Sequence, residues 1–510
     1  MNQKSDPHFQ VIIIGSGFSG LGTAIRLKQD GINDFIILER ANDVGGTWRD
    51  NTYPGCACDV QSHLYSFSFA PNPNWSRMYS PQAEIWAYLQ HCARDYGLIP
   101  HIRFQHEVRN AIWQERAQHW RVETSQGVYT ASLVVAGIGA LSEPSIPRLP
   151  GIETFMGKTF HSARWDHEYD LTNRKVAVIG TGASAIQFVP EIQPKVGALK
   201  VFQRTPPWIV PRIDRAISAK ERRIFNKFPL AQQLTRFAIY WLREFFLLCF
   251  RHPRLSSYFK NAAIRHLNRA VKDPVLRAKL TPNYTIGCKR ILLSNNYLPS
   301  LTQSNVEVIT EHIREIRPHA IVTEDGIERE IDTIIYGTGF HVTDIPLAKH
   351  ITGKHGLTLA ETWRGSPKAY LGTTISGFPN FFLLLGPNTG LGHTSVVFMI
   401  ESQIAHVISV IRYIHKHNIA AIEPRLEAQA TFLSEVDKKM RGTVWTAGGC
   451  KSWYLDATGR NSTLWPTFTW QFRHRAARLI PSDYLMSPIS RQESDCSQPV
   501  VLNAEATQPY

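Results

Sequence analysis

Cysteine is scarce in this sequence. Only seven of the 510 residues are cysteine, and that number is odd. Such sparse cysteines do not indicate a disulfide framework, so we expect a cytoplasmic protein in a reducing compartment. The one close pair, Cys56 and Cys58, has no second pair and no histidine cluster at ligand spacing, so we expect no metal site.

Long runs of positive charge are also missing. No stretch of five or more Lys and Arg residues occurs, so the sequence gives no support for an arm that binds nucleic acid. The chain nevertheless carries a net charge of +14, which favours anionic partners. Phosphate-bearing cofactors are the simplest of these. The polar start from Met1 to Gln10 does not resemble a secretory signal.

No apolar run that we identify reaches the roughly 20 residues needed to span a bilayer. The run Phe237–Phe250 has 14 residues and is interrupted by Arg243 and Glu244, so it predicts a buried or interfacial helix. Peripheral membrane contact through this run is one possible use. With 43% hydrophobic and 11% aromatic residues, the chain is not mainly disordered, and its length suits two or three domains.

The N-terminal region has the pattern of a dinucleotide-binding unit. The apolar run Val11–Ile14 leads into Gly15, Gly17 and Gly20, and then into a helical pattern over Leu21–Gln29. The first glycine permits a tight turn, the second lets a pyrophosphate approach the backbone, and the third lets helix and strand pack closely. The helix N-terminus then attracts the phosphates.

The same pattern occurs a second time. A β-branched run, Lys175–Ile179, precedes Gly180 and Gly182, and Ala185 stands at the third glycine position. A helical pattern follows from Ile186 to Val189. The chain therefore has two candidate nucleotide sites.

The residue that selects the nucleotide differs between the two units. In the first unit Glu39 lies 24 residues after the first glycine, and in the second Arg204 lies at the same spacing. A carboxylate suits a ribose with free hydroxyls, as in FAD, whereas a guanidinium suits the 2′-phosphate of NADP. We therefore predict an α/β fold with two Rossmann-like dinucleotide-binding domains, one for FAD and one for NADP, and a helical insertion.

Strands that run into glycine turns at Leu133–Ala140 and Thr333–Phe340 mark crossings between these domains. The predicted insertion is rich in helical patterns and has no glycine. The predicted parts are an FAD-binding domain at 1–145 and 345–485, an NADP-binding domain at 146–211 and 282–344, the helical insertion at 212–281, and a disordered tail at 486–510.

A short segment before the second nucleotide motif is specific to one enzyme family. Phe155, Gly157, His161, Trp165 and Asp166 form the pattern F-x-G-x3-H-x3-W-[P/D]. This pattern resembles the fingerprint of type I (class B) flavin-dependent Baeyer–Villiger monooxygenases. In that family the fingerprint lies away from the flavin and is linked to domain motion, so we assign His161 no proton transfer.

The resemblance extends over most of the chain. Segments similar to those of the family are 45–48, 53–55, 58–59, 289–290, 386–393 and 452–454. The motifs and the resemblance together predict the residues that bind FAD and NADPH: Gly15, Gly17, Phe18, Gly20, Glu39, Gly46, Thr47, Trp48, Tyr53, Asp59, Gly180, Gly182, Ala183, Ser184, Arg204, Thr205, Lys289 and Asn388.

The resemblance also implies the reaction. NADPH reduces the flavin, O2 adds to give a flavin peroxide, and this anion attacks a ketone to give an ester or lactone. An anion beside the flavin needs a fixed cation, and Arg290 is the candidate because a guanidinium is always charged and presents several donors in one plane. Asp59 is the matching carboxylate that holds Arg290, and Lys289 is a second contact for the 2′-phosphate.

Two alternatives remain open from the sequence. The same chemistry oxygenates amine nitrogen or sulfide sulfur in related flavin-containing monooxygenases, although the Trp165-Asp166 ending favours the ketone reaction. A membrane-surface binding protein built on a redox fold is the alternative outside the enzymes. Cys56 and Cys58 lack the Cys-x4-Cys spacing of the flavin disulfide reductases.

Overall fold

The computed structural model describes residues 6–252 and 255–488. Its largest sheet has eight strands, and β1 (His8–Ile14) lies at its centre between β6 (Val128–Ala136) and β2 (Phe35–Leu38), parallel to both. β2 is buried throughout and so are the last four residues of β1, as expected for parallel strands covered on both faces. The other strands of this sheet are β3 (Ile102–Arg103), β4 (Val108–Gln114), β5 (His119–Thr124), β17 (Ile351–Thr352) and β18 (Phe381–Leu383).

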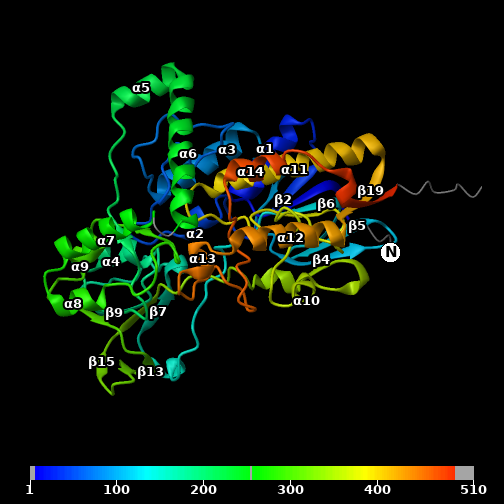
Figure 1. Cartoon of the computed structure of the whole chain (residues 1–510). Helices are drawn as coiled ribbons and strands as arrows, with labels where there is room; N and C mark the ends of the chain where they lie inside the picture. Colours follow the sequence, from blue (N-terminus) through cyan, green and yellow to red (C-terminus); the bar gives the residue numbers. More distant parts are fainter. Residues whose placement is uncertain (1–5, 253–254, 489–510) are drawn as a thin grey trace, which may run out of the picture.

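Helices α1 (Phe18–Gln29) and α11 (Val396–His417) pack against each other over one face of this sheet (Figure 1). On the other face, side chains of the sheet's own strands, among them Trp113, Trp120 and Phe381, form a core cluster with Leu359 and Trp363. α11 is the one helix in the described ranges that is long and apolar enough to cross a membrane, with mean hydropathy 1.3, but 78% of that window is buried inside the protein. It is therefore a core helix, and the sequence analysis overlooked it.

A second sheet has five strands, all parallel, in the order β12 (Val306–Ile309), β9 (Ala198–Phe202), β8 (Lys175–Ile179), β16 (Thr333–Tyr336) and β7 (Lys158–His161). The strand that precedes the second glycine turn, β8, is followed by helix α4 (Ala185–Ile192), as predicted. The predicted α/β class with two Rossmann-like units is confirmed.

The two ends of the predicted helical insertion lie next to each other. It follows β10 (Ile209–Val210) and ends before β11 (Leu292–Leu293), and these two strands pair in parallel. Figure 1 shows α5 and the upper part of α6 standing out from the body. The insertion contains α5 (Ala219–Lys227), α6 (Pro229–Arg251), α7 (Ser257–Ala270) and α8 (Pro274–Lys279).

The C-terminal end differs in part from the prediction. Met486 and the two residues after it do not begin a disordered tail, because they belong to β20 (Tyr484–Pro488), which pairs with β19 (Ile419–Pro424). The buried Tyr484 anchors this strand through a hydrogen bond of 2.8 Å between its hydroxyl and Nε2 of His406. Residues 489–510 of the predicted tail lie outside the described residues.

The remaining elements connect these layers. The helices are α2 (Thr47–Asp50), α3 (Gln82–Asp95), α9 (Tyr297–Ser300), α10 (Leu359–Trp363), α12 (Leu426–Met440), α13 (Val444–Ala447) and α14 (Thr469–Ala476). A small antiparallel sheet is formed by β13 (Ile313–Arg317), β14 (Ala320–Thr323) and β15 (Glu328–Glu330). Single 3-10 turns lie at Ile99–His101, Ile152–Thr154, Ser162–Arg164, Pro346–Lys349, Lys354–Gly356 and Pro481–Asp483.

Candidate active site

The two glycine turns open onto one cavity of about 1560 Å³. This volume exceeds that of a typical single-ligand pocket, which is at most about 1,000 Å³. Its lining includes every predicted catalytic and cofactor residue except Gly20 and Asn388. The structure thus brings together residues from positions 15 to 290 that the sequence analysis assigned separately.

The first glycine turn is shaped for a ligand at the start of α1. Gly15 has φ +90°, and a Cβ at Gly20 would lie 1.8 Å from the carbonyl oxygen of Gly15, so both glycines are required by the turn itself. A Cβ at Gly17 would meet only backbone atoms of Gly45 and Gly46, none nearer than 3.7 Å. No side chain caps α1 and no acidic residue lies in its first turn. The free N–H groups and the open backbone groove therefore fit the pyrophosphate of FAD.

Glu39 lies at the end of β2 with its carboxylate already held by the protein. Oε2 accepts hydrogen bonds from the backbone N (2.9 Å) and Oγ (2.6 Å) of Ser16. Oε1 accepts from the backbone N of Ala41 (2.9 Å) and from Arg49 (3.0 Å). Burial works to raise the pKa of Glu39, but Arg49 and these hydrogen bonds bring that pKa below its ordinary value. A ribose at this position therefore meets an ionised, fixed carboxylate. The sequence analysis missed Arg49, whose contact with Glu39 depends on the fold.

The second nucleotide unit presents two cations without an acidic partner. Arg204 and Lys289 both line the cavity, and no ion pair to either occurs in the part of the chain that the structure describes. The pKa of Lys289 is lowered by its burial and then by the positive charge of Arg204. A Cβ at Gly182 would meet only the Gly337 carbonyl, at 3.9 Å, so the backbone there is open as well. This arrangement fits a phosphate ester, as the 2′-phosphate of NADPH requires.

Arg290 and Asp59 form the ion pair that the sequence analysis predicted. Nε and Nη2 of Arg290 lie 2.7 and 2.6 Å from Oδ2 of Asp59, and Nη1 donates to the carbonyl of Leu391 at 3.3 Å. Their side chains are 27% and 31% exposed and face the cavity. Burial works to raise the pKa of Asp59, but the guanidinium lowers it below the ordinary value, and Asp59 in turn raises the pKa of Arg290. Both groups are therefore charged at neutral pH.

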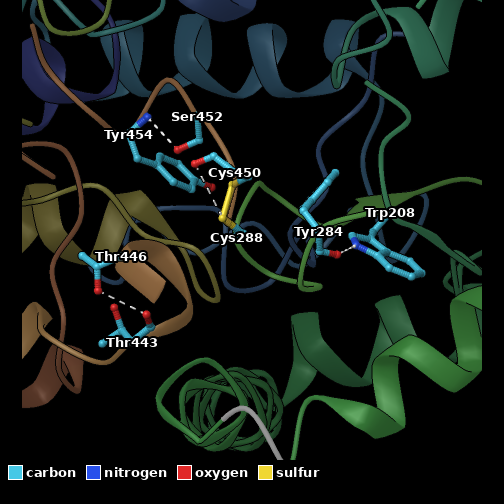
Figure 2. Close-up of a disulfide and its surroundings, with 8 residues drawn as sticks. All are labelled: Trp208, Tyr284, Cys288, Thr443, Thr446, Cys450, Ser452 and Tyr454. Carbon is cyan, nitrogen blue, oxygen red and sulfur yellow. Dashed lines mark hydrogen bonds between the residues drawn. A yellow bond between two sulfur atoms is a disulfide. The ribbon is translucent and has the colours of Figure 1, made fainter. Parts of the chain in front are cut away.

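A disulfide joins the Arg290 segment to the C-terminal region, which the sequence analysis did not predict. Cys288 and Cys450 are 162 residues apart, and their sulfurs are 2.03 Å apart (Figure 2). The backbone N of Thr285 also donates to the carbonyl of Gly448 at 3.1 Å. The expectation of unpaired cysteines is therefore wrong for these two, because residues so distant in the sequence meet only in the fold. The other described cysteines, Cys56, Cys58, Cys92 and Cys249, are free.

Other predicted residues stabilise the cavity walls. The Tyr53 hydroxyl donates to Oε1 of Gln187 on α4 at 2.9 Å, which links the two nucleotide units, and Nε1 of Trp48 donates to the Tyr65 hydroxyl at 3.1 Å. Asn388 lies behind the wall. Its Nδ2 donates to the carbonyls of residues 461 and 464, and its Oδ1 accepts from Arg460 at 2.8 Å. The structure therefore does not bring Asn388 into the cavity.

The fingerprint segment lies outside the cavity. His161 is buried, its Nδ1 accepts from the backbone N of Ala163 at 3.1 Å, and burial lowers its pKa to about 4. Trp165 packs against Phe160 and Phe188, with ring centroids 5.2 and 5.3 Å apart. A neutral, enclosed histidine at this place agrees with a structural role.

Comparison with known proteins is consistent with this geometry. The model of the family described as flavin-binding monooxygenase-like matches residues 8–352 of this chain. The chain belongs to this family. The chain is 52% identical to a Baeyer–Villiger monooxygenase of Streptomyces coelicolor over 485 residues, which cover 95% of this chain and 93% of the relative. A Baeyer–Villiger monooxygenase of Pseudomonas aeruginosa is 51% identical over 497 residues, 96% and 94% of the two chains.

The fold of this chain is also similar to solved structures of Baeyer–Villiger monooxygenases. The crystal structure of cyclohexanone monooxygenase from Rhodococcus sp. Phi1 bound to NADP+ is 28% identical, with a TM-score of 0.84 over 95% of this chain and 100% of that one. This Baeyer–Villiger family member is therefore an NADPH-dependent flavin monooxygenase with FAD and NADPH as cofactors. The alternative of a membrane-binding protein without enzymatic activity is therefore rejected.

Proposed function

We propose that this enzyme inserts one oxygen atom of O2 beside the carbonyl of a small-molecule ketone. NADPH supplies two electrons, the product is an ester or lactone, and the second oxygen atom leaves as water. The observation that carries the proposal is the Arg290–Asp59 pair, which faces the cavity shared by both nucleotide motifs. Bound FAD supplies the chemistry of O2 activation.

Arg290 is the proposed catalytic residue. Asp59 and the Leu391 carbonyl fix its guanidinium at three nitrogens, so its charge does not need to reorganise during the reaction. At ~4 Å and an effective dielectric of ~20, such a cation stabilises an anion by about 4 kcal/mol before desolvation. The guanidinium polarises the ketone oxygen and stabilises the negative charge that develops on it. Asp59 is a positioning residue, and its lowered pKa keeps it ionised for that purpose.

The experiment that tests this function is NADPH consumption by the purified holoenzyme against a panel of ketones, amines and sulfides. We expect esters or lactones from ketones, formed in proportion to NADPH consumed. Oxygenation of amines or sulfides with no ester from any ketone would favour the alternative that the sequence left open. Sulfoxide formed beside ester is a side activity and does not contradict the proposal.

Nucleotide preference tests the two cations. We predict that Arg204→Ala raises the Michaelis constant for NADPH roughly 10- to 150-fold, because a charge-assisted hydrogen bond contributes ~1.5–3 kcal/mol. The constant for NADH should change little. Lys195→Ala, at an exposed site outside the cavity lining, is the control and should leave both constants unchanged. Equal losses with both nucleotides would place the phosphate site elsewhere.

The pH dependence of NADPH binding tests Lys289. Only the protonated amine attracts a phosphate, and the pKa of Lys289 is lowered by burial and by Arg204. We therefore predict that the Michaelis constant for NADPH rises as pH increases through this lowered pKa, while that for NADH stays flat. Lys289→Arg should remove the rise, because a guanidinium stays charged. A rise that persists in Lys289→Arg would assign the titration to another group.

The two sheets support a division of the chain into two nucleotide-binding domains. We propose that 1–145 and 345–485 form the FAD-binding domain, that 146–211 and 282–344 form the NADP-binding domain, and that 212–281 is an insertion on the latter. We also propose a cytoplasmic location, with a small-molecule ketone and O2 as partners.

A further inference from the structure

Helix α6 presents an apolar face to solvent. Leu234, Phe237, Trp241, Leu242 and Phe245 are 60%, 61%, 46%, 51% and 62% exposed. Four of them recur at intervals of three or four residues, so they form one stripe along the helix. Every exposed side chain from Leu234 to Phe245 is apolar, the remaining one being Ala238. Isolated exposed apolar residues are ordinary, but a continuous stripe of this kind marks an interaction surface.

Three charged residues of the same helix point inward. Arg236 donates to the carbonyl of His63 at 2.7 Å, and Nε of Arg243 donates to Gln61 at 2.7 Å. Glu244 is 1% exposed and accepts a hydrogen bond from the Thr469 hydroxyl at 2.7 Å. These bonds fix the rotation of α6 about its axis. The apolar stripe therefore cannot turn inward without breaking buried hydrogen bonds, and its outward orientation is built into the fold.

The insertion that carries this stripe holds most of the net charge of the protein. Residues 212–281 contain sixteen lysines and arginines against four acidic residues, which is +12 of the net +14 of the chain. Lys220, Arg223 and Lys227 on α5 are exposed beside the N-terminal end of the stripe, and Arg251 is exposed at the C-terminal end of α6. Figure 1 shows that α5 and the upper part of α6 lie at the outer edge of the molecule.

We propose that the α5–α6 edge docks onto an anionic membrane surface. Apolar and aromatic side chains enter the interface between lipid headgroups and acyl chains, while the flanking cations bind the lipid phosphates. A second copy of this chain would bring a second set of the α5 cations against this face, and like charges oppose such an interface. Nucleic acid would satisfy the cations but would leave the aromatic stripe in water. The inference does not depend on which substrate the enzyme oxygenates.

The test is flotation of the full-length holoenzyme with lipid vesicles. We expect binding to vesicles that contain phosphatidylglycerol, weak binding to pure phosphatidylcholine, and loss of the electrostatic part at about 1 M salt, where the Debye length is ~3 Å. Phe237→Glu and Trp241→Glu should each weaken binding by about tenfold or more, because each removes an aromatic ring from the interface and adds a repelled charge.

Two further variants separate the contribution of the apolar stripe from that of the flanking cations. Leu426→Glu, at a residue on α12 that is 62% exposed like Phe237, should leave vesicle binding unchanged. Arg223→Glu combined with Lys227→Glu should weaken binding at low salt and have little effect at high salt. NADPH-dependent turnover of a water-soluble ketone should stay at the wild-type level in all these variants.

Two results would overturn the proposal. The first is absence of flotation with anionic vesicles at low salt. The second is a dimer, seen by light scattering, that Phe237→Glu converts to monomers while vesicle binding is unaffected. That result would assign the stripe to a second copy of this chain.

Discussion

Arg290→Ala is expected to reduce ketone oxygenation by ~10² to 10³-fold, the usual loss when one group that stabilises an oxyanion is removed. FAD should remain bound, because Arg290 belongs to neither glycine turn. NADPH oxidation should continue at a reduced rate and should yield hydrogen peroxide in place of ester. The measurement is ester formed per NADPH consumed, together with hydrogen peroxide.

Graded variants make this prediction specific. Arg290→Lys should not restore ester formation, because an ammonium cannot contact Oδ2 of Asp59 through two nitrogens as the guanidinium does. Asp59→Ala should show a milder loss, since the cation remains but is no longer positioned. Arg317→Ala is the control, because Arg317 pairs with Glu315 and Glu328 on the surface. If Arg290→Ala keeps the wild-type ratio and rate, Arg290 is not the catalytic arginine.

Gly17→Val should abolish FAD binding and leave the protein folded. A Cβ at Gly17 has no protein atom nearer than 3.7 Å, so the branched side chain occupies space left for the pyrophosphate and not space filled by the chain. Flavin absorbance per protein should fall to background, while the circular dichroism of the variant should match that of wild-type apoprotein. Retention of FAD by Gly17→Val would move the flavin site away from the first glycine turn.

Gly20→Ala provides the contrast. Its Cβ would lie 1.8 Å from the carbonyl oxygen of Gly15, so the turn itself must move. Gly20→Ala should therefore lower the thermal unfolding temperature of the apoprotein as well as FAD binding. Gly17→Val should lower FAD binding and leave the thermal unfolding temperature of the apoprotein unchanged. The two variants together separate a ligand contact from a packing requirement within one motif.

The sequence predicted the parts of the site that depend on local spacing. Glu39 and Arg204 were found because strand, turn and helix fix their distance from a glycine turn. Arg290 and Asp59 were paired only through the family resemblance, since 231 residues separate them. Contacts that arise from tertiary packing were missed, among them Arg49 with Glu39 and the Cys288–Cys450 disulfide. Asn388 was placed at the cofactor by its motif, and only the structure shows its side chain holding the neighbouring loop.

The uneven charge distribution also bears on how the coenzyme finds its site. Without the insertion the chain has a net charge of only +2, from +14 less +12. Part of the insertion's charge lies beside the NADPH site, because Gln203, the residue before Arg204, donates a hydrogen bond to the carbonyl of Lys279 at the end of α8. The field of the insertion therefore adds to the attraction that Arg204 and Lys289 exert on an anionic nucleotide. The association rate of NADPH should then fall as ionic strength rises, because salt screens this attraction.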